Sequence, residues 1–76
     1  MEIKDFVERF AEQFDDTDIN VFKPETVFHD LDEYTSLIAL SIILMIDEEY
    51  GVNIVAEEMS AAVTIEDLFN IVKSKI

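Results

Sequence analysis

Apolar residues near the start of the chain recur at intervals of three and four residues, which is the spacing of one face of an α-helix. Charged residues fill most of the positions between them. This pattern predicts an amphipathic helix over residues 3–14, which ends where an acidic run begins. Its apolar face consists of Ile3, Phe6, Val7, Phe10 and Phe14.

Residues 15–34 show no sustained helical period and contain the only proline of the chain, Pro24. We interpret this segment as a long connecting loop. Loops of this length in small domains are usually functional or are held in place by their own side chains. The side chains that we expect to hold this loop are Val21, Phe22, Phe28 and Leu31.

A second helix is predicted to begin at Thr35 or Ser36, because either hydroxyl can accept a hydrogen bond from the free N–H groups at a helix start. It should end at Tyr50, since Gly51, the only glycine, suits the left-handed conformation that ends many helices. Its apolar residues surround nearly the whole helix. The face that we expect to be buried consists of Ala39, Ile42, Ile43, Ile46 and Tyr50. The opposite face consists of Leu37, Leu40, Leu44 and Met45, accompanied by Ser41, Asp47 and Glu48.

This second face has two interpretations. A small monomeric protein seldom leaves a continuous apolar strip unused, so the face is a candidate docking surface with an acidic rim. Alternatively, the helix lies in the centre of the domain and is buried on all sides, as helices that are apolar all round usually are.

The last third of the chain predicts two further helices. Residues 52–62 have a weak pattern that allows one or two helical turns, formed around Glu57, Glu58 and Met59. A longer helix follows, because Thr64 and Asp67 have the spacing of a capping box and the cations Lys73 and Lys75 suit a C-terminal helix dipole. Its apolar face consists of Ile65, Leu68, Phe69, Val72 and Ile76.

No pair of strands with a hairpin turn is visible. We therefore predict an all-α fold, formed by residues 1–76 as a single domain. It should be a small four-helix bundle, with three main helices, a short third helix and a long loop between the first two.

The charge distribution restricts the partners. The net charge is −13, and residues 24–72 contain no Lys or Arg. Such a surface repels nucleic acids and anionic membranes, whereas basic patches on proteins complement it. The longest apolar stretch, residues 37–46, is too short to cross a bilayer, and the first residues lack the order of a signal peptide. We expect a monomeric cytoplasmic protein that does not insert into membranes.

The residue types that usually carry catalysis are scarce. There is no Cys, and His29 is the only imidazole, with no recognisable nucleophile and carboxylate arranged around it. The run from Asp16 begins like a calcium-binding loop, but Val21 stands where such a loop needs Gly and Val27 where it needs Glu. We expect neither an enzyme nor a metal site.

Ser36 lies where the loop meets the second helix. The free N–H groups and the positive dipole end of a helix start stabilise a phosphate attached at such a position. The simpler alternative is that Ser36 only caps the helix.

Three segments of the chain together resemble the acyl carrier protein family, and the resemblance spans the whole chain. Members carry a Ser-Leu pair at the start of their second helix, a Glu-Glu-Phe-Gly-like end to that helix, and a Thr-Val-x-Asp-like start to the last. The corresponding segments here are Ser36-Leu37, Glu48-Glu49-Tyr50-Gly51 and Thr64-Ile65-Glu66-Asp67. The preceding run from Pro24 to Thr35 is similar to the family as well.

The resemblance implies a four-helix bundle in which a transferase esterifies Ser36 with 4′-phosphopantetheine from coenzyme A. The terminal thiol of this cofactor then carries acyl groups as thioesters between the enzymes of fatty-acid, polyketide or related biosynthesis. The implied partners are the phosphopantetheinyl transferase and acyl-transferring or adenylating synthases and ligases with basic docking patches. The residues expected to contact them are Leu37, Leu40, Ser41, Leu44, Asp47, Glu48, Glu57 and Glu58.

The sequence departs from the family pattern at three positions. Thr35 stands where the family usually has Asp, which removes a carboxylate that can assist a magnesium-dependent transferase. Ile38 and Ser41 replace residues that are commonly acidic in fatty-acid carriers, which favours dedicated partners and allows an aminoacyl or aryl cargo. The alternative function is an unmodified, carrier-like acidic interaction module.

Overall fold

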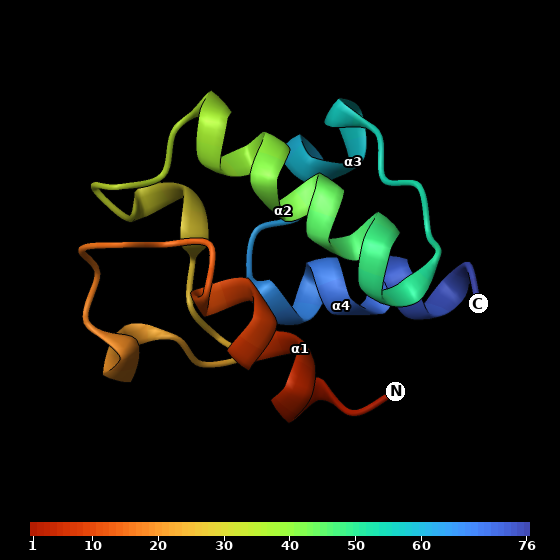
Figure 1. The fold of residues 1–76 in the computed structure, drawn as a ribbon, viewed down its shortest axis with the longest axis horizontal. Coiled ribbons are helices and arrows are strands. Elements are labelled where there is room, and N and C mark those ends of the chain that lie inside the picture. Colours follow the sequence, from red (N-terminus) through yellow and green to blue (C-terminus); the bar gives the residue numbers. More distant parts are fainter.

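Four α-helices surround one apolar core in the computed structural model, which describes residues 1–76 (Figure 1). They are α1 (Ile3–Ala11), α2 (Ser36–Tyr50), α3 (Ala56–Ala61) and α4 (Ile65–Ser74). Two short 3₁₀ turns, η1 (Ile19–Val21) and η2 (Phe28–Asp30), lie in the loop between α1 and α2. The predictions of an all-α fold, of four helices and of a long first loop are therefore confirmed. None of these helices has the length and apolar character needed to span a membrane.

The core is aromatic at its centre and contains no buried polar residue. The Phe10 ring lies 5.6 Å from Phe14, 6.3 Å from Phe22 and 5.3 Å from Phe28, measured between centroids. Because Phe22 and Phe28 belong to the long loop, the loop contributes to the same core as α1. Such aromatic pairs stabilise by about 0.5–1.5 kcal/mol beyond the area that they bury.

Helix α1 is shorter than predicted, although its apolar face is buried as expected except for Ile3, which is only partly buried. It ends at Ala11, and tighter turns follow, in which the N–H groups of Gln13 and Phe14 donate to Phe10 (3.2 Å) and Ala11 (3.0 Å). These turns still bring Phe14 into the core. The spacing of apolar residues therefore identified the buried face correctly but placed the helix end three residues too late.

The long loop is held by its side chains, with one correction. Phe22 and Phe28 are buried and Leu31 is half-buried, as predicted, whereas Val21 is exposed because η1 turns it outward. The loop is also attached to the start of α4, where the N–H groups of Ile65 and Glu66 donate to the carbonyls of Thr26 (3.1 Å) and Pro24 (2.9 Å). Val27 and Thr64 form an isolated antiparallel bridge beside these bonds.

The other helix ends follow the predicted local rules. Gly51 ends α2 in the left-handed conformation, with φ at 66°, and its N–H donates to the carbonyl of Asp47. Thr64 and Asp67 form the predicted capping box at the start of α4. Ile76 is exposed rather than buried, because α4 ends at Ser74 and the last residue no longer follows its apolar face.

Candidate functional site

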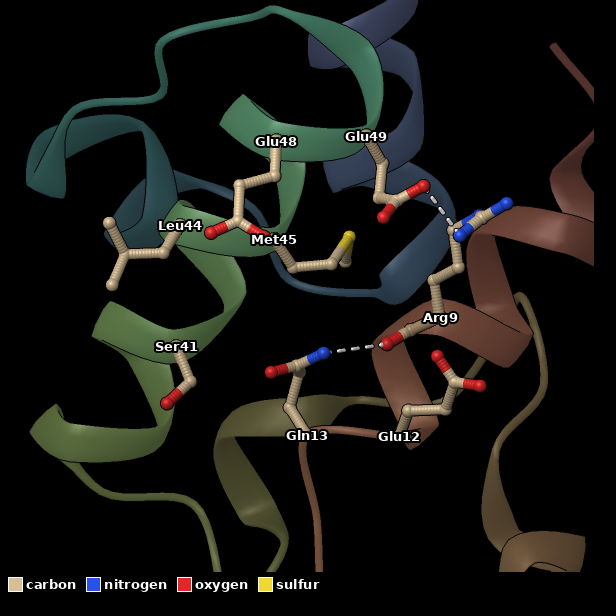
Figure 2. A pocket seen from close by; sticks show the side chains of 8 residues that line it. All are labelled: Arg9, Glu12, Gln13, Ser41, Leu44, Met45, Glu48 and Glu49. Carbon is tan, nitrogen blue, oxygen red and sulfur yellow. Dashed lines mark hydrogen bonds and ion pairs between the residues drawn. The ribbon is translucent and has the colours of Figure 1, made fainter.

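Helix α2 is buried along one side only, so the interpretation of a helix buried all round is wrong. Ile42, Met45 and Ile46 are buried, and the rest of the predicted buried face is partly covered. Met45 was predicted to lie on the exposed face, and its burial corrects that prediction. Its side chain faces α1 across the notch drawn in Figure 2, so packing against α1 moves the buried arc of α2 toward Met45.

Three leucines form an exposed apolar row along the outer side of α2. Leu37, Leu40 and Leu44 are 72%, 51% and 52% exposed. Asp47 and Glu48 continue the row toward the end of the helix and are exposed too, while Ser41 is partly covered. We call Leu37, Leu40 and Leu44 the leucine row.

At the start of α2, the structure shows which of two neighbouring hydroxyl residues caps the helix, which the sequence could not decide. Thr35 is the N-cap, since its backbone is extended (φ −137°, ψ 174°) and its Oγ1 accepts a hydrogen bond from the N–H of Ile38 at 3.3 Å. Ser36 is the first helical residue and is exposed, and its hydroxyl makes no hydrogen bond within the chain. The alternative in which Ser36 itself caps the helix is therefore wrong.

Ser36 lies at the rim of an apolar groove between α2 and α3, with a volume of about 620 Å³. His29 and Tyr34 of the loop stand at the same end, and the Nε2 atom of His29 lies 3.1 Å from the carbonyl oxygen of Met59. This contact connects the loop to α3. Burial raises the pKa of Tyr34. The groove is lined mainly by Ala39, Leu40, Ile43, Ala56, Met59 and Ser60.

A smaller, polar notch of about 260 Å³ lies between α1 and α2, next to the leucine row (Figure 2). Arg9 of α1 reaches Glu49 of α2 at 2.6 Å, and the Nε2 atom of Gln13 donates to the carbonyl of Arg9 at 3.1 Å. Figure 2 shows Ser41 and Glu48 on the α2 side of the notch. Since Arg9 is paired, Glu12 and Glu48 leave the notch anionic.

The acidic residues of α3 have different surroundings. Glu57 is exposed. Glu58 accepts hydrogen bonds from Lys75 (2.7 Å) and from the N–H of Val55 (3.1 Å), and these bonds, that of Lys75 first, hold the pKa of Glu58 below its ordinary value. Glu58 is therefore partly neutralised by Lys75, whereas Glu57 is not.

The structure thus brings most of the predicted site residues onto neighbouring surfaces of α2 and α3. Sequence reasoning missed the contribution of the residues that follow α1, where Glu12 adds a carboxylate and Gln13 an amide to the notch that also contains Glu48. The i, i+4 spacing of Arg9 and Gln13 was visible, but it did not indicate which helix they face. No group of three acidic or imidazole side chains is arranged to hold a metal ion.

No family model, no curated protein and no solved structure matches this chain.

Proposed function

We propose that the protein is a carrier of the acyl carrier type, in which Ser36 bears 4′-phosphopantetheine and the thiol of that arm holds acyl, aminoacyl or aryl groups as thioesters. One observation carries the proposal: the Ser36 hydroxyl is exposed and unbonded at the N-terminus of α2, because Thr35 performs the capping. A transferase can thus reach this oxygen without breaking a bond that stabilises the helix.

The surroundings of Ser36 suit a phosphodiester. Helix α2 has 15 residues and no acidic residue in its first turn, so no carboxylate of that turn opposes its positive dipole end at the attachment point. A negative group at such a position is stabilised by about 0.3–1 kcal/mol. Ser36 also lines the groove between α2 and α3, which offers an apolar surface on which part of the attached arm or its cargo can lie.

The leucine row gives partner enzymes an apolar contact, and the exposed Asp47, Glu48 and Glu57 attract basic patches on them. A carrier must leave one enzyme before it can meet the next. Steering by exposed charge raises the association rate without slowing release, so binding of partners should weaken as the salt concentration rises.

The test is the mass of the intact protein after co-expression with a phosphopantetheinyl transferase of broad specificity. We expect an increase by one phosphopantetheine group in the wild type and in Ser60→Ala, which removes another hydroxyl of the same groove. We expect no increase in Ser36→Ala.

Absence of modification with several transferases would reject the carrier and favour the second candidate, an unmodified acidic interaction module. The observation that favours this candidate is the threonine at position 35, which caps α2 but supplies no carboxylate beside Ser36. In that module the leucine row and its acidic rim would be the whole functional surface.

A further inference from the structure

The cations of this acidic chain are distributed unequally. Arg9 is paired with Glu49, and Lys75 with Glu58. Lys73 stands alone in the last turn of α4. Lys4 and Lys23 also make no ion pair. Both line one groove, although they come from different parts of the chain.

This groove lies between the first half of α1 and the segment from η1 to Pro24 and has a volume of about 600 Å³. Small-molecule sites typically measure roughly 300–1,000 Å³. Val7 and Phe22 form a buried part of its lining, whereas Ile19 is 70% exposed beside them. Its apolar lining consists of Ile3, Val7, Ile19 and Phe22.

The wall of the groove is fixed by local hydrogen bonds. The Asp18 carboxylate accepts from the N–H of Asn20 at 2.9 Å and thereby caps η1. The Thr26 hydroxyl donates to the carbonyl of Val21 (2.6 Å) and accepts from the N–H of Lys23 (2.9 Å). The turn that exposes Ile19 and positions Lys23 is therefore formed before any ligand arrives, which lowers the entropic cost of binding.

We propose that this groove binds a single-chain amphiphile with one carboxylate, its tail on the apolar lining and its head near Lys4 and Lys23. The charged residues that line the groove determine how many negative charges the head group should carry. Glu8 also lines the groove, so the two lysines and this carboxylate sum to a single positive charge. A monoanion balances that charge, whereas a dianion would keep one negative charge that no residue of the groove compensates.

The same charges disfavour larger occupants. A second copy seated on this groove about a two-fold axis would place like lysines opposite each other. An acidic protein or an anionic membrane would meet the repulsion of a molecule with a net charge of −13. A small monoanion experiences far less of this repulsion, because only one charge must approach.

The groove is remote from Ser36. In Figure 1 the first half of α1 and the turn around residue 20 lie along the lower edge, whereas α2 begins at the upper edge. The proposed binding is thus independent of the carrier function, and Ser36→Ala should bind the amphiphile as the wild type does.

The experiment is a titration of the unmodified, ¹⁵N-labelled protein with decanoate below its micellar concentration, followed by amide chemical shifts. Saturable shifts should cluster at residues 3–8 and 19–24. Lys4→Gln and Lys23→Gln should each weaken binding by about two- to fivefold, the effect of losing one exposed charge pair. Lys73→Gln, which changes the net charge equally at a residue that does not line the groove, should bind decanoate as the wild type does.

The neutral methyl ester of decanoate separates charge recognition from simple apolar adsorption. The wild type should prefer decanoate to the ester, and the double variant Lys4→Gln/Lys23→Gln should lose that preference. Shifts that cluster instead in the groove between α2 and α3, equal binding of acid and ester by the wild type, or no saturable shift would each overturn the proposal.

Discussion

One carboxylate, that of Glu33, organises the beginning of the long loop. Its two oxygens accept hydrogen bonds from the N–H of Asp15 (2.6 Å), the N–H of Asp16 (3.0 Å) and the hydroxyl of Thr17 (2.7 Å). The bond from Thr17, followed by that from Asp15, lowers the pKa of Glu33 from its ordinary value of 4.5. The negative form of Glu33 is therefore favoured by the folded state.

Replacing Glu33 by Gln should lower the melting temperature near neutral pH. Because the folded pKa lies below 4.5, the ionised carboxylate stabilises the fold above this value and loses its effect as the pH falls through the folded pKa. The difference in melting temperature between wild type and variant should thus shrink in acid, as measured by circular dichroism over a pH series. Glu25→Gln, at an exposed position without such bonds, is the control. A pH-independent difference would contradict this role.

The hydroxyls at the start of α2 show what the sequence can and cannot specify for single residues. Either Thr35 or Ser36 satisfies the preference for a hydroxyl at an N-cap. Only the backbone conformation decides between them, because the cap residue is extended and the next is helical. The candidate residue Ser36 was therefore predictable, but its freedom from hydrogen bonds was not.

At the scale of the helix, the assignment of the cap to Thr35 predicts different effects of substitutions at positions 35 and 36. Thr35→Ala should destabilise the protein by about 1 kcal/mol through loss of the cap. Thr35→Asp should preserve stability, since Asp also caps well, and should accelerate modification of Ser36 by adding a carboxylate beside it. Ser36→Ala should leave stability nearly unchanged.

Chemical denaturation measures the stabilities of these variants, and the time course of the mass increase measures the modification. If Ser36→Ala destabilises the protein as much as Thr35→Ala does, the assignment of the cap to Thr35 is wrong.

Helix positions and types were largely predictable, because apolar spacing and capping residues act within a few residues of each other. The misplaced features depend on packing between elements. Met45 is buried because α1 lies on that side of α2, and Val21 is exposed because η1 redirects it. Lys4 and Lys23 reach one groove only after the chain has folded, so no local pattern could reveal that they meet.

For the whole molecule, the net charge of −13 should make stability depend on ions. Repulsion among the carboxylates opposes the compact state, and salt or divalent cations weaken this repulsion. Millimolar magnesium chloride or added potassium chloride should raise the melting temperature in a calorimetric scan. A gain of 1 kcal/mol corresponds to about 4–8 °C for a domain of this size. An unchanged or lowered melting temperature would refute the expectation.

The bonds between the long loop and the start of α4 affect how the molecule opens. The first N–H groups of a helix usually face water and fray easily, but those of Ile65 and Glu66 donate to loop carbonyls. Local unwinding at this end of α4 therefore also breaks two of the bonds that hold the segment around Pro24 and Thr26. We therefore expect these two stretches, which are separated by the whole of α2 and α3, to exchange their amide hydrogens at similar rates.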